Sequence, residues 1–546
     1  MNSIHLKKYF CILFVVIFLF SSNAFAEKIV TKEKSNDNKN DKIFLIDNSI
    51  LAEDIDPLVD LNITVSIKEI RALDKIDILS NPDFYIKLFI NDEEFKSKTW
   101  KNQKYVNETW SVTKNVPDNI EFVNITIELW DSNIGSDKLC DISGNTPSDP
   151  NSYSVNLYYS LKTGHWMGDD FYRNMPILFD KSGYGRLNGC DDFTYQDGDN
   201  DCEIIFDITQ NDYDNDGIPY WAETNIFNKS GQCDPLIDDS GRDDDEDGIP
   251  IEWEYKWGHS FSQSWYHGNI NHKWFYNPFI YNDHKNIDLD LDGLDNVEEY
   301  LTSQWGSDPF RKDIFVEIDQ MKVIKENDET LGAYLPKNTK NLIRDGYSKH
   351  NIFLHVDDGC MGGGQIIPFD YNTSSKELQD FHFKYFMNNN SSYWRRGVFH
   401  YGLIIFKADR ARGNAFSTTT DGKNYSIDSY QLSTSFHEVM PQSYPILDLL
   451  RRGVWDKEKQ RAMIYAGVMM HEIGHSLGIF GGSQVPGCDN SLSIFPRIFW
   501  FRFKNYKSCM NYNYVYSLVD YSDGSHGKND HDDWDLIDLT LFQQKL

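Results

Sequence analysis

The sequence predicts a chain of several domains: an N-terminal all-β sandwich, an acidic connector with little regular structure, and a C-terminal α+β domain. Three observations lead to this fold class. Short segments of alternating apolar and polar residues fill residues 58–208, carboxylates recur at fixed spacing in residues 209–310, and strand-like segments precede one long helix in residues 311–546. A chain of 546 residues has room for these units, since a domain usually takes about 150 residues.

The first residues have the pattern of a secretory signal peptide. Two lysines precede an apolar run over residues 9–20, and a small-residue cleavage site ends at Ala26. The run is shorter than a membrane-spanning helix needs, so we expect residues 1–26 to be removed and the protein to be secreted into the extracellular medium. An uncleaved N-terminal anchor is the alternative. Residues 27–57 are rich in Lys, Asn, Asp and Glu and predict a flexible leader.

Residues 58–208 alternate as the strands of a half-buried sheet do. In residues 63–67, 84–88 and 125–129 every second residue is apolar, and turn-rich stretches separate these segments. An alternation with period two places the apolar side chains on one face of each strand. The pattern therefore predicts antiparallel strands packed as a sandwich.

Two loops of this sandwich resemble the calcium loops of the C2 domain, the lipid-binding sandwich of the protein kinase C type. The first loop includes residues 77–88, and the second includes residues 129–137. The resemblance implies that these loops hold calcium and dock on a lipid or protein surface. Asn133 stands where that family usually has a carboxylate, and a plain structural sandwich with polar loop tips is the alternative. The carboxylates that the resemblance would assign to calcium are Asp77, Asp83, Asp131 and Asp137.

The carboxylates of residues 209–310 follow one repeated spacing. In each of three segments, aspartates alternate with other residues, a glycine follows, and a glutamate stands at the twelfth position. Calcium binds six to eight oxygens, so alternate carboxylates of a tight turn can face one ion while the glutamate closes the shell. The glycine permits the left-handed backbone that bends the chain around the ion. We therefore expect about three calcium ions, held by Asp212, Asp214, Asp216 and Glu223, by Asp243, Asp245, Asp247 and Glu254, and by Asp288, Asp290, Asp292 and Glu299.

The residues after each glycine separate these repeats from sensor EF-hands. Pro219 and Pro250 follow in the first two segments, and we expect them to compromise the start of an exiting helix. The pattern resembles the thrombospondin type-three repeats and related bacterial or archaeal calcium repeats. The resemblance implies a connector that calcium stiffens, because the ions hold together acidic loops that would otherwise repel.

The C-terminal region, residues 311–546, begins with segments that predict a sheet and continues with a long helix. Residues 456–477 contain good helix formers, an acidic start and an apolar stripe, and Gly478 is a natural helix end. The strands that we expect before this helix are residues 312–319, 352–356 and 401–406.

His471 and His475 lie four residues apart in this helix, and Glu472 lies between them. Residues four apart share a helix face, so both imidazoles can reach one zinc ion. Glu472 is close enough to take a proton from zinc-bound water, whose pKa zinc lowers to about 7. The motif therefore predicts a catalytic zinc site that hydrolyses amide bonds.

Residues 508–512 resemble the methionine turn of the metzincin peptidases, and they follow the helix motif in the expected order. The resemblance implies that Met510 lies beneath the zinc and that Tyr512 ligates the metal or stabilises the oxyanion. One position departs from the metzincin pattern. The third ligand would stand three residues after the helix-ending glycine, where this chain has Gly481.

Asp489 is the preferred third zinc ligand, since zinc accepts carboxylate oxygens and a disulfide at the preceding Cys488 would fix the loop. We expect Cys488 to pair with Cys509, because both flank the loop beyond the helix and disulfides form in secreted proteins. His526 and His531 are the alternative ligands. A site with only two ligands, and without activity, is the remaining alternative.

The charge and the motifs together predict the function. A net charge of −31 argues against a nucleic-acid partner, which requires a basic surface. We expect a secreted zinc-dependent endopeptidase that calcium stabilises and that acts on protein or peptide substrates. Docking on a membrane or surface through the sandwich is a further expectation, and the oligomeric state is left open. The alternative is a secreted calcium-binding adhesion or surface protein whose peptidase-like domain is inactive.

Overall fold

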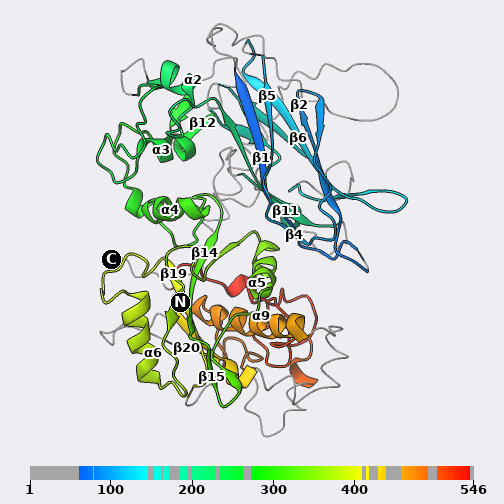
Figure 1. The fold of residues 1–546 in the computed structure, drawn as a ribbon, viewed down its shortest axis with the longest axis vertical. Coiled ribbons are helices and arrows are strands. Elements are labelled where there is room, and N and C mark those ends of the chain that lie inside the picture. Colours follow the sequence, from blue (N-terminus) through cyan, green and yellow to red (C-terminus); the bar gives the residue numbers. More distant parts are fainter. Residues whose placement is uncertain are drawn as a thin grey trace, which may run out of the picture.

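The computed structural model describes most of the chain beyond residue 60: residues 61–77, 79–117, 119–144, 153–161, 164–170, 185–192, 200–227, 233–261, 272–274, 276–408, 413–416, 428–437, 457–489 and 501–541. The predicted signal peptide, residues 1–26, and leader, residues 27–57, lie outside this part. Figure 1 shows a sandwich in blue and cyan, short helices in green, and a C-terminal unit that continues to red. None of the described helices has the length and apolar character that a membrane crossing requires.

Two antiparallel sheets form the N-terminal sandwich, as the alternating pattern predicted. In β1, Ile63 and Val65 are buried in the core, while Thr64 points outwards and its hydroxyl lies 2.8 Å from that of Thr113 on β5. One sheet contains β1 (Asn62–Ala72), β4 (Tyr105–Val106), β5 (Trp110–Asn115), β10 (Arg186–Asn188) and β11 (Cys202–Gln210). The other contains β2 (Phe84–Ile90), β3 (Glu93–Lys96), β6 (Phe122–Asp131), β7 (Lys138–Cys140), β8 (Val155–Ser160) and β9 (Trp166–Gly168).

The acidic connector contains more regular structure than the sequence predicted. Helix α3 (Ile251–Gly258) begins directly after Pro250, and α2 (Tyr220–Ala222) begins directly after Pro219. A proline at a helix start costs no hydrogen bond, because the first N–H groups of a helix have no partner within it. The expectation that these prolines compromise an exiting helix was therefore wrong. The remaining elements are a π-helical turn (Glu223–Phe227), β12 (His259–Phe261), β13 (His272–Trp274), α4 (Asn296–Thr302) and 3-10 turns at His284–Asn286 and Ser303–Trp305.

The C-terminal unit is built around a sheet whose strands run parallel except at one edge. The predicted strands are present as β14 (Asp313–Met321), β17 (Phe353–Asp357) and β19 (Phe399–Ile405). The order is β17-β14-β19-β21-β20, where β21 is Ser429–Ser433, β20 (Gly413–Phe416) runs antiparallel to β21, and β18 (Ile366–Ile367) pairs with β14. The other elements are the hairpin β15 (Ile324–Glu326) and β16 (Glu329–Leu331), and α6 (Ser375–Phe381).

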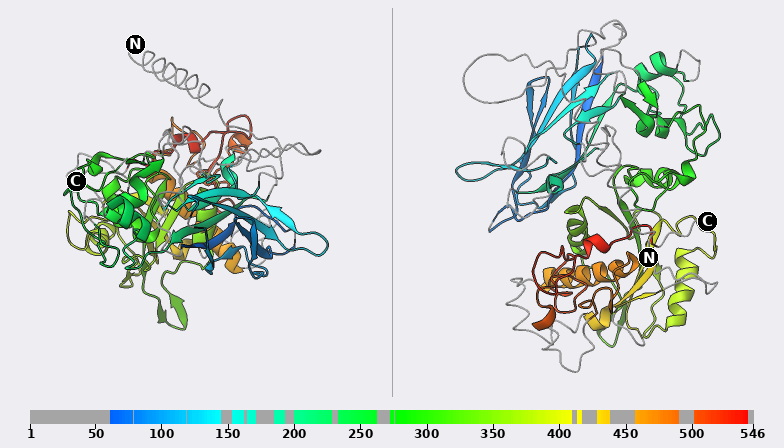
Figure 2. Two further views of the ribbon diagram at one scale, coloured as in Figure 1. Left: turned by 90° about the horizontal axis from the view of Figure 1, so that it is seen from above. Right: turned by 180° about the vertical axis from the view of Figure 1, so that it is seen from behind.

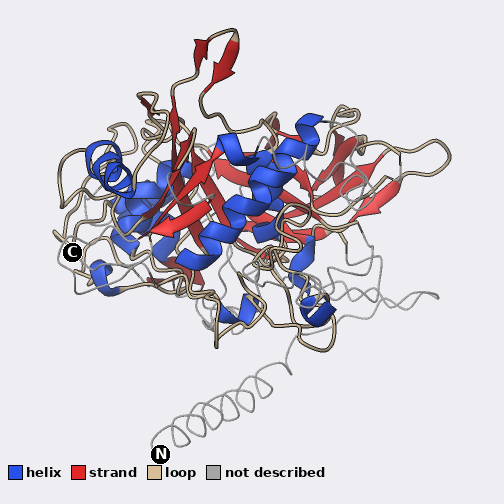
Figure 3. Ribbon diagram, turned by 90° about the horizontal axis from the view of Figure 1, so that it is seen from below, coloured by secondary structure: helices blue, strands red, loops and turns tan. Residues whose placement is uncertain are grey.

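Two helices cover one face of this sheet. The long helix α9 (Lys457–Ser476) corresponds to the predicted helix and packs against α5 (Thr339–Ser348) and against β21 and β20. Figure 3 shows α9 lying across the strands, and the view from behind in Figure 2 shows the sheet between α9 and α6. Strands β14, β19 and β21 are buried along most or all of their length, as parallel strands covered on both faces should be.

A buried ion network joins the sandwich to α5. Arg71 of β1 is 2% exposed, and its guanidinium lies 3.0 Å from the carboxylate of Asp345 on α5. Lys104 approaches the same carboxylate at 2.7 Å, and the hydroxyl of Tyr105 donates to it at 2.6 Å. Because α5 packs on α9, the sandwich braces the helix that carries the two histidines.

Candidate metal centre

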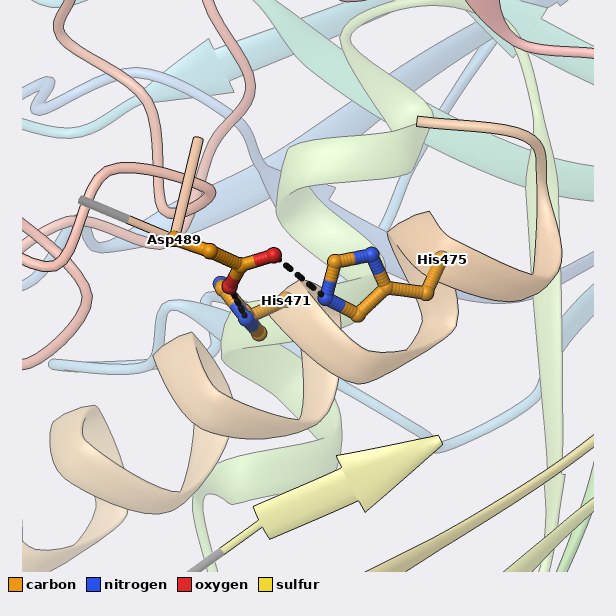
Figure 4. Close-up of side chains that lie close together, drawn as sticks. All are labelled: His471, His475 and Asp489. Carbon is orange, nitrogen blue, oxygen red and sulfur yellow. Dashed lines mark ion pairs between the residues drawn. The ribbon is translucent and has the colours of Figure 1, made fainter. Parts of the chain in front are cut away.

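Backbone carbonyls fix both histidine rings of α9. Nδ1 of His471 lies 3.0 Å from the carbonyl oxygen of Cys509, and Nδ1 of His475 lies 2.8 Å from that of Ile479. A carbonyl can only accept, so each Nδ1 carries the proton and each Nε2 presents a lone pair. Figure 4 shows the two rings turned towards the same point in front of the helix. A metal-ligating imidazole usually has this arrangement.

Asp489 completes a group of three potential ligands. Its carboxylate lies 3.3 Å from Nε2 of His471 and 3.6 Å from Nε2 of His475 (Figure 4). Its N–H donates to the carbonyl of Met510 at 3.2 Å, and its backbone is left-handed, with φ of 52°. The three side chains offer ligand atoms that all lie within 4.8 Å of one another. The structure therefore brings together the residues that the sequence nominated as zinc ligands, and the zinc itself stays a prediction.

Gly481 explains why the metzincin spacing does not apply. A Cβ added to Gly481 would lie 3.4 Å from a carboxylate oxygen of Asp489, so the expected ligand position is beside the aspartate. A side chain from the later turn thus occupies the space that the missing ligand leaves.

The charges of the three side chains respond to one another. Burial alone would raise the pKa of Asp489, but hydrogen bonds from His471 and His475 hold this pKa well below its usual range. Burial alone would lower the pKa of His475, but the carboxylates of Asp489 and Glu472 outweigh burial and raise it. The pocket therefore favours a positive charge between the rings and the carboxylate, which a divalent cation would supply.

Met510 forms the floor of this group. Its side chain is fully buried, and its N–H donates to Oγ of Ser508 at 3.0 Å. A Cβ added to Gly474, between the two histidines, would lie 2.6 Å from Sδ of Met510. Glycine at this position lets the methionine approach the helix backbone directly beneath the two rings.

Glu472 and Tyr512 lie at the rim of the group. Glu472 is 5% exposed and is close enough for its charge to act on His475 and on Tyr512. The ring of Tyr512 stacks on that of His471, with centroids 5.2 Å apart. Burial, and next the carboxylate of Asp489, raise the pKa of Tyr512, so its hydroxyl stays protonated and can donate a hydrogen bond.

The alternative ligands belong to other parts of the structure. Nδ1 of His526 lies 3.1 Å from Asp530 and 3.5 Å from Asp523, in a separate group. The ring of His531 packs against Tyr506, with centroids 5.4 Å apart. Neither histidine is grouped with His471 and His475 among the described residues.

The predicted disulfide is absent from the structure. Cys488 and Cys509 are both buried free thiols, and the thiol of Cys488 is directed to the carboxylate of Asp489 at 3.6 Å. This contact turns the sulfur away from the bond that we expected. The sequence analysis missed a different contact, between the fully buried thiols of Cys140 and Cys202, which hydrogen bond across the sandwich.

The three acidic segments adopt one backbone conformation. The fourth residue is left-handed in each, and so is the glycine at the sixth position. The first aspartate accepts from the glycine N–H at 2.9–3.1 Å, and the third accepts from the N–H of the residue after the glycine at 2.7–3.1 Å. The left-handed residues are Asn215, Gly217, Glu246, Gly248, Leu291 and Gly293. The repeated spacing therefore encodes a repeated fold, in which the carboxylates converge.

Several carboxylate oxygens in these loops are buried and make no hydrogen bond. A buried polar atom without a partner is costly, and an ion that several such oxygens share removes the cost. Burial, and next the charges of neighbouring aspartates, raise the pKa of Glu223 to about 8. The predicted calcium-binding side chains with such oxygens are Asp214, Asp216, Glu223, Asp245, Glu254, Asp290 and Glu299. These residues fit calcium, whose ligands are oxygens.

Further carboxylates come from outside the repeat pattern. Asp239 lies with Asp216 and Glu223 in one group, and the charges of Asp308 and Asp313 act on Glu299. Asp308 has a buried oxygen without a partner. The sequence pattern did not identify these residues as ligands, because only the fold brings them to the loops.

The four carboxylates of the sandwich loops have protein donors. Nζ of Lys138 lies 3.2 Å from Asp77 and 4.0 Å from Asp131. The backbone of Asn102 donates to Asp83 at 2.6 Å, and the backbone of Asn133 donates to Asp137 at 3.0 Å. A lysine thus supplies positive charge between two of these aspartates, and calcium in these loops stays a prediction.

Comparisons with known proteins give little beyond the sandwich. No family model and no curated protein matches the chain. Human GIVD cytosolic phospholipase A2 with a fluorophosphonate inhibitor and terbium chloride is 17% identical, with a TM-score of 0.16, over 28% of this chain and 17% of that chain. A C2 domain is 12% identical (TM-score 0.16; 27% of this chain, 98% of that chain), and the two calcium-bound C2 domains of extended-synaptotagmin 2 are 13% identical (0.17; 28% and 45%). The similar structures thus include C2 domains, and TM-scores this low carry no argument about ligand or activity.

Proposed function

We propose that the chain is a secreted zinc-dependent endopeptidase. The observation that carries this proposal is the donor set of His471, His475 and Asp489. Two imidazoles and one carboxylate are a common protein ligand set of catalytic zinc, which keeps a further position for water. The carbonyl oxygens that fix both Nδ1 atoms support the same interpretation, because they orient the Nε2 lone pairs.

Bound zinc would supply a Lewis acid that polarises the scissile carbonyl and acidifies the attacking water. Glu472 then accepts the proton of that water and delivers it to the leaving amine. The protonated hydroxyl of Tyr512, at the rim, donates a hydrogen bond to the oxygen on which negative charge develops. Met510 and Gly474 keep the two histidines at a fixed depth.

An extended polypeptide is the substrate that the surrounding fold favours. Strand β20 is the outermost strand of the C-terminal sheet among the described strands, runs antiparallel, and contacts α9. An edge strand presents backbone N–H and C=O groups that an extended peptide can pair with. A peptide added at this edge would pass beside the helix that carries Glu472.

We also propose that calcium holds the acidic connector. The buried, unpartnered carboxylate oxygens support this role, since like charges at such short range repel without a cation. The third loop contacts the C-terminal sheet directly, because the N–H of Asp313 on β14 donates to Asp292 at 2.7 Å. Calcium in this loop would therefore also fix the start of the central strand.

The test of the peptidase proposal is Glu472→Gln, with Glu458→Gln on the same helix as the matched control. Glu472→Gln should lower the rate of cleavage of a fluorescent casein by about 100-fold or more and leave the zinc content unchanged. Glu458 pairs with Arg461 at the start of α9, and its substitution should change neither quantity. Wild-type protein that holds zinc and cleaves no protein substrate would favour the inactive adhesion or surface protein instead.

A further inference from the structure

The three acidic loops differ in the group that joins their fifth and twelfth positions. In each loop the aspartate before the glycine and the closing glutamate meet a third side chain from elsewhere in the fold. That third side chain is Asp239 beside Asp216 and Glu223, His284 beside Asp247 and Glu254, and Asp313 beside Asp292 and Glu299. The first and third loops thus receive another carboxylate, and the second loop receives an imidazole.

His284 is directed into the second loop. Its Nε2 lies 3.1 Å from the carboxylate of Asp247 and 3.6 Å from that of Glu254, and all three side chains are at most 1% exposed. This Nε2 has no hydrogen-bond partner of acceptable geometry in the described structure. Both oxygens of Asp245 and one oxygen of Glu254 are buried and unpartnered as well. One nitrogen and several oxygens therefore face the same space without satisfying one another.

The position of the histidine is fixed from several sides. The side-chain amide of Asn296 contacts the other ring nitrogen, Nδ1, at 2.8 Å. The rings of Trp253 and Tyr276 pack edge-on against the imidazole, with centroids 6.0 and 5.0 Å away. The N–H of Asn282 donates to Asp247 at 3.0 Å, which fastens the histidine segment to the loop. A ring held in this way cannot swing out to solvent.

We propose that the second loop binds a zinc-class transition metal through His284, Asp247 and Glu254, while the first and third loops bind calcium. Calcium takes oxygen ligands, whereas imidazole nitrogen suits zinc and its neighbours in the first transition series. The ligand atoms of the three residues lie within 4.8 Å of one another, the same limit that the peptidase donor set satisfies. This inference rests on the proposal that the loops bind metal, and it is independent of peptidase activity.

The test is a zinc count on the full chain in excess calcium. Protein stripped with a chelator is dialysed against millimolar calcium and micromolar zinc, and bound zinc is measured by mass spectrometry. His284→Asp gives the second loop the carboxylate that the first loop has, so it should bind one zinc fewer than the wild type. Asp239→Asn, the matched change at the first loop, should leave the zinc count unchanged. His475→Ala removes zinc from the peptidase group alone, so failure of that site is seen separately.

His284→Asp with the same zinc count as the wild type would overturn the inference and leave His284 as a counter-charge to Asp247 and Glu254. Circular dichroism establishes that the variant is folded. If it is not, crystals of the wild type grown in calcium and zinc decide the question by anomalous scattering at the zinc edge. A peak beside Nε2 of His284 supports the inference, and a zinc peak at His471 without one at His284 overturns it.

Discussion

Without calcium, the acidic loops should make the protein less stable as the pH rises. Burial, and next the charges of neighbouring carboxylates, raise the pKa of Glu223 from 4.5 to about 8 and that of Asp216 from 3.8 to about 6. The pKa of Glu254 is raised to about 7, with burial again as the main cause. These carboxyl groups take up protons in the folded, metal-free protein at a pH at which the unfolded chain has lost them.

A pKa that is higher in the folded state than in the unfolded state sets the direction of the effect. The folded state then binds the proton more tightly, so the stabilisation is fully present below the unfolded pKa and is lost as the pH rises through the folded pKa. For Glu223 this window extends from about pH 4.5 to about pH 8. One pKa unit corresponds to about 1.4 kcal/mol, and screening by solvent at the open side of the loop reduces the full shift of Glu223 to about 2 kcal/mol.

The assay is thermal unfolding of the full chain at pH 5 and pH 8, with calcium and with a calcium chelator that spares zinc. The metal-free midpoint should fall between pH 5 and pH 8, and calcium should raise the midpoint more at pH 8, where the carboxylates that bind it are ionised. Glu223→Gln should remove about 2 kcal/mol of this pH dependence, while Glu326→Gln on the exposed hairpin strand β15 should leave it unchanged. A calcium effect of equal size at both pH values would refute the reasoning.

Two substitutions test how the metal centre is supported. Gly474→Ala places a Cβ 2.6 Å from Sδ of Met510 and should lower the free energy of unfolding by about 1 kcal/mol, because overpacking exceeds the helix preference of alanine. Urea unfolding and zinc content measure this effect, and a more stable variant with full zinc would contradict it. Asp345→Asn leaves Arg71 buried with fewer counter-charges and should cost about 2 kcal/mol, since Glu69 still lies 3.0 Å from the guanidinium. Asp328→Asn on the exposed hairpin is the control, and equal thermal midpoints for the two variants would argue against a brace between sandwich and α5.

The features that the sequence predicted are those that short stretches of chain encode. The loop geometry depends on glycines such as Gly217 and on hydrogen bonds within a few residues, so spacing alone was enough to indicate it. The same holds for His471 and His475, which one helix places on one face.

Contacts between distant segments could not be predicted in this way. His284 and Asp239 reach the loops only through tertiary packing, and no spacing rule relates them to the repeats. Lys138 lies among the sandwich aspartates because β7 pairs with β6, a register that the sequence does not specify. Asp489 was nominated only because it follows the position where a ligand was missing, and its left-handed backbone brings it back towards the helix.

The most direct test of a catalytic zinc at His471, His475 and Asp489 is reconstitution of cleavage. Protein stripped of metal and returned to calcium alone should cleave no protein substrate. Added zinc should restore cleavage to the wild type and to His284→Asp, but not to His475→Ala. Cleavage in calcium alone, or restoration of His475→Ala by zinc, would contradict the account.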